Sequence, residues 1–222
     1  MKFKGQEVTF LGWLDNVWYH FKAPIIIGFL ATVILVVCSV QFFSREEHDV
    51  FIYVAGERGL AAKDADAFMT EMQDTFAIDS NDDGKTVVDM KIDKFVMVEN
   101  ASGNKKIFNP TEQMNPIQRF NLELADGECI IYIIQPDFFK GNLKYFASFE
   151  DTLGYVPDKA ISGKGIRLSD LDAYTASMTL GYFPEDYIIC IADKDKKYDD
   201  EYYNGNVEFL KNLIEWNVKQ KQ

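Results

Sequence analysis

Histidine is scarce in this chain, and its scarcity removes several kinds of chemistry. The 222 residues include only His20 and His48, both in the first quarter of the sequence. Residues 50–222 therefore offer no imidazole for a Ser-His or Cys-His nucleophile pair. They also lack the histidine on which most zinc sites depend.

Cysteine is also rare, with three residues in all. Cys38 follows Val37, where a lipoprotein signal needs a small residue, so we interpret Cys38 as a buried membrane thiol rather than a lipidated one. Cys129 and Cys190 lie in apolar, strand-like runs. Two buried core thiols and a disulfide between neighbouring strands are both compatible with that pattern.

Positive charge is in deficit: 23 Lys and Arg face 35 Asp and Glu, for a net charge of -12 at pH 7. A chain this acidic repels nucleic acid, which is therefore not expected as a partner. The acidic excess most simply favours solubility, with cation binding as a further use.

Charge is absent between Ala23 and Phe43 (APIIIGFLATVILVVCSVQFF). At about 1.5 Å of rise per residue, a helix of this length matches the roughly 30 Å hydrocarbon core of a bilayer. A cleavable signal peptide has a shorter apolar core and a small-residue cleavage site, and Ser39–Ser44 (SVQFFS) offers no such site. We therefore expect a single transmembrane helix that serves as a signal-anchor.

The flanks of this run predict its orientation. Lys2, Lys4 and Lys22 precede it, and positive flanks are retained on the cytoplasmic side. We expect a single-pass protein of the cell membrane with a cytoplasmic N-terminus. The expected organisation is a cytoplasmic amphipathic segment at 1–22, the transmembrane helix at 23–43, a linker at 44–49 and an extracellular α/β domain at 50–222.

Apolar residues recur at helical spacing in the segment before the run. They are Phe10, Leu11, Leu14, Val17, Trp18 and Phe21, with Trp13 and Tyr19 beside them. Aromatic residues of this kind suit the interface between headgroups and acyl chains. Ordinary juxtamembrane sequence and contact with a partner explain the pattern equally well.

Strand-like and helix-like patterns alternate after residue 50. Apolar or alternating runs predict strands at 50–55, 86–98, 129–134 and 187–192. Helical spacing predicts helices at 64–76, 115–127, 136–146 and 206–218, the second capped by Asn115-Pro116. The charged stretch Asp193–Glu201 is predicted to be a loop. This order predicts an α/β fold with one mostly parallel sheet and helices on both faces.

Several of these residues resemble a known family. Leu122–Phe146 (LELADGECIIYIIQPDFFKGNLKYF) resembles a segment of bacterial extracellular solute-binding proteins, and Tyr187–Ala192 with Asn206–Trp216 is similar to their closing strand and helix. The head WYHFKAPIIIGFLATVILVV resembles the anchors of uncharacterised single-pass proteins of Gram-positive bacteria that carry such a domain. The resemblance implies one lobe of the periplasmic-binding-protein type.

Open α/β sheets bind ligands at the carboxyl ends of their strands. That rule selects Glu57 and Arg58 after the first strand, and Gln135 and Asp137 after the third. We expect Arg58 to contact an anionic or polar ligand group, because its guanidinium makes two directed hydrogen bonds. The alternative interpretation is that all four are ordinary turn residues.

Asp79-Ser-Asn81-Asp-Asp83-Gly84 matches the first half of a calcium loop, with oxygen ligands at alternate positions. Met90 occupies the twelfth position, where such loops carry a bidentate glutamate. A polar turn is therefore the first interpretation, and a weak calcium site formed by Asp79, Asn81 and Asp83 is the second. No other cofactor is expected.

These features favour a membrane-tethered, non-enzymatic extracellular domain that binds a small polar ligand or a partner protein. The alternative is a structural or assembly subunit that docks onto another envelope protein and has no small-molecule ligand. A third hypothesis is a hydrolase that uses paired carboxylates such as Glu150-Asp151 or Asp199-Asp200, although chance adjacency in an acidic chain explains those pairs.

Overall fold

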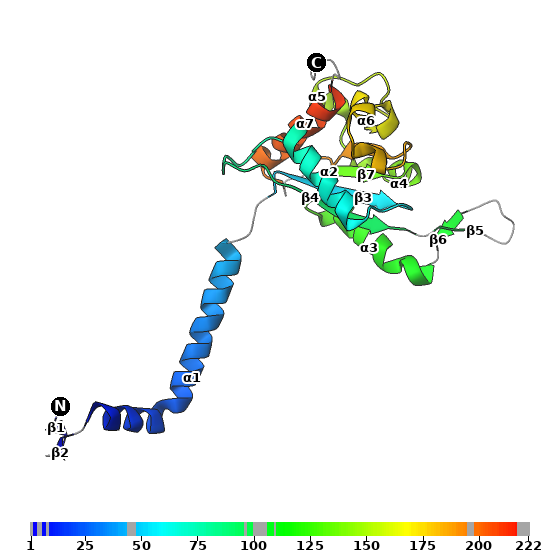
Figure 1. The fold of residues 1–222 in the computed structure, drawn as a ribbon. Helices are drawn as coiled ribbons and strands as arrows, with labels where there is room; N and C mark the ends of the chain where they lie inside the picture. Colours follow the sequence, from blue (N-terminus) through cyan, green and yellow to red (C-terminus); the bar gives the residue numbers. More distant parts are fainter. Residues whose placement is uncertain are drawn as a thin grey trace. The chain divides into compact units, whose positions relative to one another are not determined.

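The computed structural model describes residues 2–3, 6–7, 9–43, 48–95, 97–99, 106–108, 110–194 and 198–216 (Figure 1). The chain divides into two units, Met1–Glu46 and Glu47–Gln222. We call the second unit the sheet domain. Most of the predicted linker, at 44–47, lies outside the described residues.

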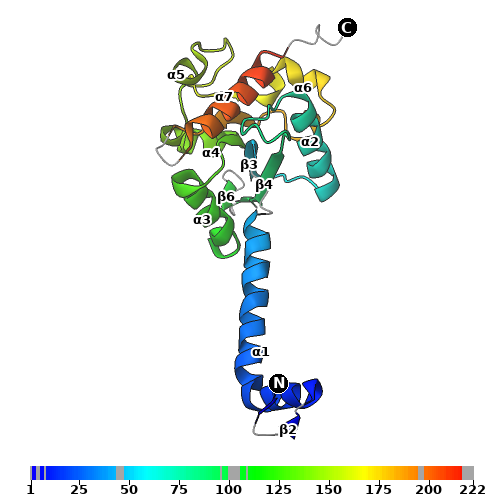
Figure 2. The same cartoon turned by 90° about the vertical axis from the view of Figure 1, so that its left-hand side faces the viewer.

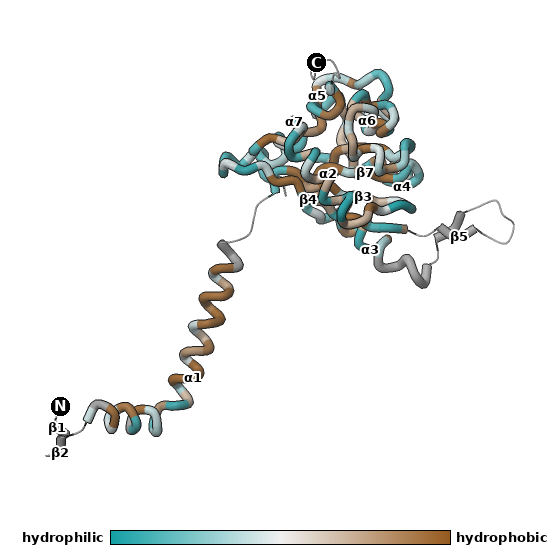
Figure 3. The backbone as a smooth tube through the Cα atoms, viewed as in Figure 1, coloured by the Kyte–Doolittle hydropathy of each residue, from teal (hydrophilic) through white to brown (hydrophobic). Residues whose placement is uncertain are grey.

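The first unit is dominated by one long helix. β1 (Lys2–Phe3) and β2 (Gln6–Glu7) form a short antiparallel pair, and α1 (Phe10–Phe43) follows. Within α1, Val17–Val40 is long and apolar enough to cross a membrane, as its colouring shows in Figure 3. The prediction of an apolar N-terminal helix of membrane-spanning length is confirmed.

The sheet domain is built around five strands in the order β4-β3-β7-β9-β8. They are β3 (Val50–Gly56), β4 (Val88–Lys94), β7 (Ile131–Ile134), β8 (Gly165–Arg167) and β9 (Ile188–Ile191). β3 pairs in parallel with β4 and β7, whereas β9 pairs antiparallel with both β7 and β8. The α/β class is confirmed, but the sheet is mixed rather than mostly parallel because β9 runs against the other four strands.

Alternate side chains of the central strands enter two separate cores. In β3, Ile52 and Val54 point to one face, and Tyr53 and Ala55 point to the other, as the period of a strand requires. α2 (Ala62–Thr75) and α7 (Asp200–Ile214) cover the first face, and α3 (Pro110–Asp126) and α4 (Pro136–Gly141) cover the second (Figure 2). Helices therefore lie on both faces, as predicted.

The remaining elements are short. β5 (Met97–Glu99) and β6 (Lys106–Phe108) form an antiparallel hairpin between β4 and α3. After β7 come α5 (Phe149–Leu153), α6 (Asp172–Ala176) and the single turns η1 (Leu143–Tyr145), η2 (Leu168–Asp170) and η3 (Leu180–Tyr182).

Two helices begin five or six residues earlier than the sequence predicts. α3 starts at Pro110, so the predicted cap at Asn115-Pro116 is wrong and Pro116 lies inside the helix. α7 starts at Asp200, within the stretch predicted to be a loop. Its cap is Asp199, whose carboxylate accepts a hydrogen bond from the N–H of Glu201.

The strand register decides between the two interpretations of the cysteines. β9 places Cys190 opposite Tyr132, and Cys129 lies three residues before Tyr132, ahead of the start of β7. Both thiols are free and buried in the core on the α3/α4 face. Burial raises the pKa of each thiol, which keeps both protonated and unreactive. Cys129 and Cys190 are core thiols, and this register excludes a disulfide between them.

β4 forms one edge of the sheet. The Phe95 N–H donates to β3, and the Val87 carbonyl accepts from the start of β3. Because successive residues of a strand direct their backbone groups to opposite sides, the odd-numbered residues of β4 face β3 and Met90 faces away from it. The outward N–H of Met90 donates to the carboxylate of its neighbour Asp89 at 2.7 Å. This edge donor is therefore occupied by a side chain of the same strand.

Candidate functional site

The chain leaves β3 and β7 toward opposite faces of the sheet. After β3 it enters α2, whose Phe68 packs in the core on the α2/α7 face. After β7 it enters α4, whose Phe139 packs in the core on the α3/α4 face. Because β3 and β7 are parallel neighbours, their carboxyl ends form a topological switch point, where ligands bind in open α/β sheets.

Hydrogen bonds join the two loops at this switch point. The Gln135 N–H donates to the Ala55 carbonyl at 3.0 Å, which extends the pairing of β7 with β3. The Gln135 side-chain oxygen accepts from the Glu57 N–H at 3.1 Å. Gln135 therefore fixes the backbone of the loop that carries Glu57 and Arg58.

Tyr187 is the residue of this site that the sequence analysis missed. It precedes β9, whose reversed direction brings its first residues to the carboxyl ends of β3 and β7. The Tyr187 hydroxyl accepts from the Arg58 N–H at 3.1 Å and lies 3.3 Å from the Arg58 carbonyl, to which it donates. Burial raises the pKa of Tyr187, so the hydroxyl stays protonated and both bonds are kept.

Gly56 permits the close approach of Tyr187. A Cβ atom at Gly56 would lie 1.9 Å from the Tyr187 hydroxyl oxygen. We expect Gly56→Ala to lower the free energy of unfolding by about 1 kcal/mol, because the tyrosine has to move from its pocket. Urea unfolding measures the loss. Gly181→Ala is the matched control, since a Cβ there meets nothing within 4 Å, and an equal loss in both variants would contradict this packing.

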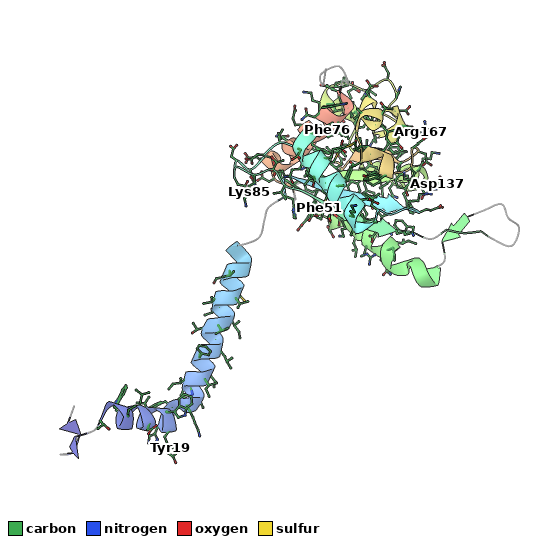
Figure 4. All side chains as sticks on the ribbon, viewed as in Figure 1. Tyr19, Phe51, Phe76, Lys85, Asp137 and Arg167 are labelled. Carbon is green, nitrogen blue, oxygen red and sulfur yellow. The ribbon has the colours of Figure 1, made fainter. Side chains whose placement is uncertain are left out.

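The side chains at the switch point carry both signs of charge. Arg58 and Asp137 are exposed, Glu57 is partly buried, and Asp186 directly precedes Tyr187 in the chain. Asp137 is labelled in Figure 4. Lys94 ends β4 opposite Gly56. The Gln135 side chain thus holds the loop that carries Glu57 and Arg58, and Asp137 lies two residues beyond Gln135 in the first turn of α4.

The predicted calcium loop forms a tight polar turn. The Asn81 and Asp83 side chains accept from the N–H groups of Asp83 and Lys85, and Asp79 Oδ2 accepts from the Gly84 N–H. Asp79 Oδ1 is buried without a hydrogen-bond partner. Across the described residues, no group of three or more His, Cys, Asp or Glu is arranged to hold a metal ion. The polar turn accounts for three of these oxygens, and calcium binding stays a prediction.

A second polar cluster, which the sequence analysis also missed, docks α3 on β4. Asp93 is 3 % exposed and accepts from the Tyr53 hydroxyl and from Arg119 at 2.5 and 3.0 Å. Burial and the neighbouring Asp93 raise the pKa of Tyr53. Tyr53 is thereby held as a proton donor, which suits a structural bond rather than a general base.

The same helix and strand are joined one turn further along. Glu123 accepts from Lys91 Nζ at 2.8 Å and from the Cys129 N–H at 3.0 Å. Burial acts to raise the pKa of Glu123, but these two donors outweigh it and the pKa is lowered. The signal in the sequence is the pair of spacings Lys91-x-Asp93 on a strand and Arg119-x-x-x-Glu123 on a helix, which place each pair on one face.

No protein-family model, curated protein or solved structure matches this chain. The likeness to one lobe of a solute-binding protein, and to the anchored proteins of Gram-positive bacteria, therefore stays a prediction from the sequence pattern.

Proposed function

We propose that this chain is a membrane-anchored, non-enzymatic binding protein whose sheet domain holds a small polar ligand at the switch point between β3 and β7. The observation that carries the proposal is the placement of Arg58. The Tyr187 hydroxyl bonds to both the N–H and the carbonyl of Arg58. The Arg58 guanidinium is exposed and makes no ion pair or hydrogen bond within the described residues. A preorganised backbone that presents an available side chain lowers the entropic cost of binding.

The local charges indicate the class of ligand. Glu57, Asp137 and Asp186 contribute negative charge, and Arg58 and Lys94 contribute positive charge. A strongly anionic ligand would meet more carboxylates than cations at this edge, whereas a zwitterion or a neutral polyol would find complementary partners for both donors and acceptors. An amino acid or a sugar fits this balance best.

Thermal unfolding of the purified sheet domain with sugars, amino acids and calcium tests the binding role. A ligand that binds only the folded state at 100 times its Kd adds about 2.7 kcal/mol of stability. We expect such a ligand to raise the melting temperature of the wild type and of Arg167→Ala, but not of Arg58→Ala. Arg167 is a suitable control because it is an exposed arginine on β8. A library without any shift would favour the alternative of an assembly subunit.

The proposed location is the outer surface of the cell membrane, with the N-terminus in the cytoplasm. Lys2, Lys4 and Lys22 precede the charge-free run that begins at Ala23 and support this orientation. Protease added to intact cells is expected to digest the sheet domain while a cytoplasmic marker survives. Digestion only after lysis would place the domain on the cytoplasmic side.

A further inference from the structure

α1 changes direction near its only proline. Figures 1 and 2 both show the first turns of α1 running across the axis of the later turns. Pro24 lies inside the helix. It lacks the N–H that would bond to the carbonyl of His20, and its ring collides with that carbonyl, which together kink a helix. The turns before Pro24 therefore do not continue the axis of the membrane span.

These first turns have one apolar face. At about 100° per residue, Leu14, Val17 and Phe21 fall on one side of the helix, and Asp15 and Tyr19 fall on the other. Leu14 is 44 % exposed and Phe21 is 56 % exposed, whereas Val17 is partly buried, so most of this face is open within the described chain.

Two tryptophans mark the borders of the apolar face. On the same helical projection, Trp13 lies on one side of Leu14, Val17 and Phe21, and Trp18 lies on the other. Their side chains are about half exposed, at 51 % and 53 %. Indole combines an apolar ring with an N–H donor, and it accumulates where acyl chains meet headgroups. Two indoles at opposite borders of one face suit a helix that lies parallel to a membrane surface.

We propose that residues 10–21 form an in-plane membrane helix whose apolar face rests on the acyl chains beside the span, so that only the part of Val17–Val40 from Ala23 onward crosses the bilayer. The proposal rests on the membrane anchor proposed above. The bend decides the position of Trp13: a straight α1 would carry it about 15 Å beyond the start of the apolar run at Ala23, into water. The bent α1 returns it to the interface. Lys22 lies at the bend, where its stem reaches headgroup phosphates.

Fluorescence of the full chain in phosphatidylcholine vesicles tests the proposal. Trp18→Phe together with Trp216→Phe leaves Trp13 as the single indole. We expect a blue-shifted emission, little quenching by aqueous iodide, and more quenching by bromines near the headgroup end of the acyl chains than by bromines near the bilayer centre. Adding Pro24→Ala, which restores the missing N–H, is expected to shift the emission to the red and to expose Trp13 to iodide.

A matched probe on the polar face completes the test. In a chain whose three native tryptophans are replaced by Phe, Tyr19→Trp is expected to be quenched by iodide and not by either brominated lipid. Equal lipid quenching at positions 13 and 19 would contradict a one-sided helix, and iodide quenching of Trp13 with Pro24 in place would overturn the proposal. Vesicle flotation separates two failures: a chain that floats with an exposed Trp13 refutes only the in-plane helix, and a chain that does not float refutes the anchor as well.

Discussion

Asp49→Ala is expected to lower the free energy of unfolding of the sheet domain by about 3 kcal/mol. The Asp49 side chain is fully buried. One carboxylate oxygen accepts from the Ser80 N–H at 2.7 Å and from the Ser80 hydroxyl at 2.9 Å, and the other accepts from the Val87 N–H at 2.7 Å. Alanine leaves all three donors without an acceptor, and it releases the turn at 79–87 from the start of β3.

Two further variants separate this bonding from a general effect of losing an aspartate. Asp49→Asn keeps one acceptor oxygen, so we expect it to recover part of the loss. Asp66→Ala removes an exposed carboxylate from α2 and is expected to change stability by less than about 0.5 kcal/mol. Urea unfolding of residues 48–222 measures all three. A loss for Asp49→Ala as small as that for Asp66→Ala would show that the turn does not depend on Asp49.

Glu123→Gln is expected to lower the free energy of unfolding by about 2 kcal/mol at pH 7. This difference from the wild type is expected to disappear at acidic pH. The side chain of Glu123 is 6 % exposed, whereas that of its partner Lys91 is 43 % exposed, so solvent screens part of their attraction. The folded pKa of Glu123 is lowered. Its contribution is therefore fully present above the unfolded pKa of about 4.3 and disappears as pH falls through the folded value.

The difference between wild type and Glu123→Gln should accordingly shrink as pH falls from about 5 toward the acid limit of the folded state. Protonated glutamate then resembles glutamine in both shape and charge. Glu150→Gln changes an exposed residue in the first turn of α5 and serves as the control, with little difference from wild type at any pH. Urea unfolding across this pH range provides the measurement. A cost for Glu123→Gln that is independent of pH would contradict the assigned ion pair.

Four of the five strands of the sheet were predictable from the sequence. Burial on both faces leaves a continuous apolar run in β3, β7 and β9, and β4 lies within the alternating run at 86–98, whose last residues form β5 in a separate sheet. The direction of a strand leaves no such pattern, which is why the reversal of β9 was not predicted. Local rules also misplaced two helix starts. α3 contains Pro110 and Pro116. Either proline could have marked the first turn of a helix, but the helix begins at Pro110. The charged stretch Asp193–Glu201 predicts a loop, whereas Asp199 caps α7, which begins at Asp200.

The candidate site was predictable only in part, because one side of it depends on the direction of β9. Glu57, Arg58, Gln135 and Asp137 follow strands whose parallel pairing the sequence indicated, so their shared edge could be expected. Tyr187 reaches that edge only because β9 is antiparallel, and an apolar run that begins with tyrosine reads equally well as core. The clusters around Asp93 and Glu123 depend on the packing of α3 against β4, which no local pattern specifies.

The occupied N–H of Met90 bears on how copies of this protein behave at high local concentration. Exposed strand edges are templates for intermolecular β-pairing and fibril growth, and natural proteins blunt them with charge. At β4 an approaching strand would have to displace the Asp89 carboxylate from the Met90 donor and then sit against its negative charge. The Asp89 carboxylate thus makes β-pairing less favourable at this position of the edge.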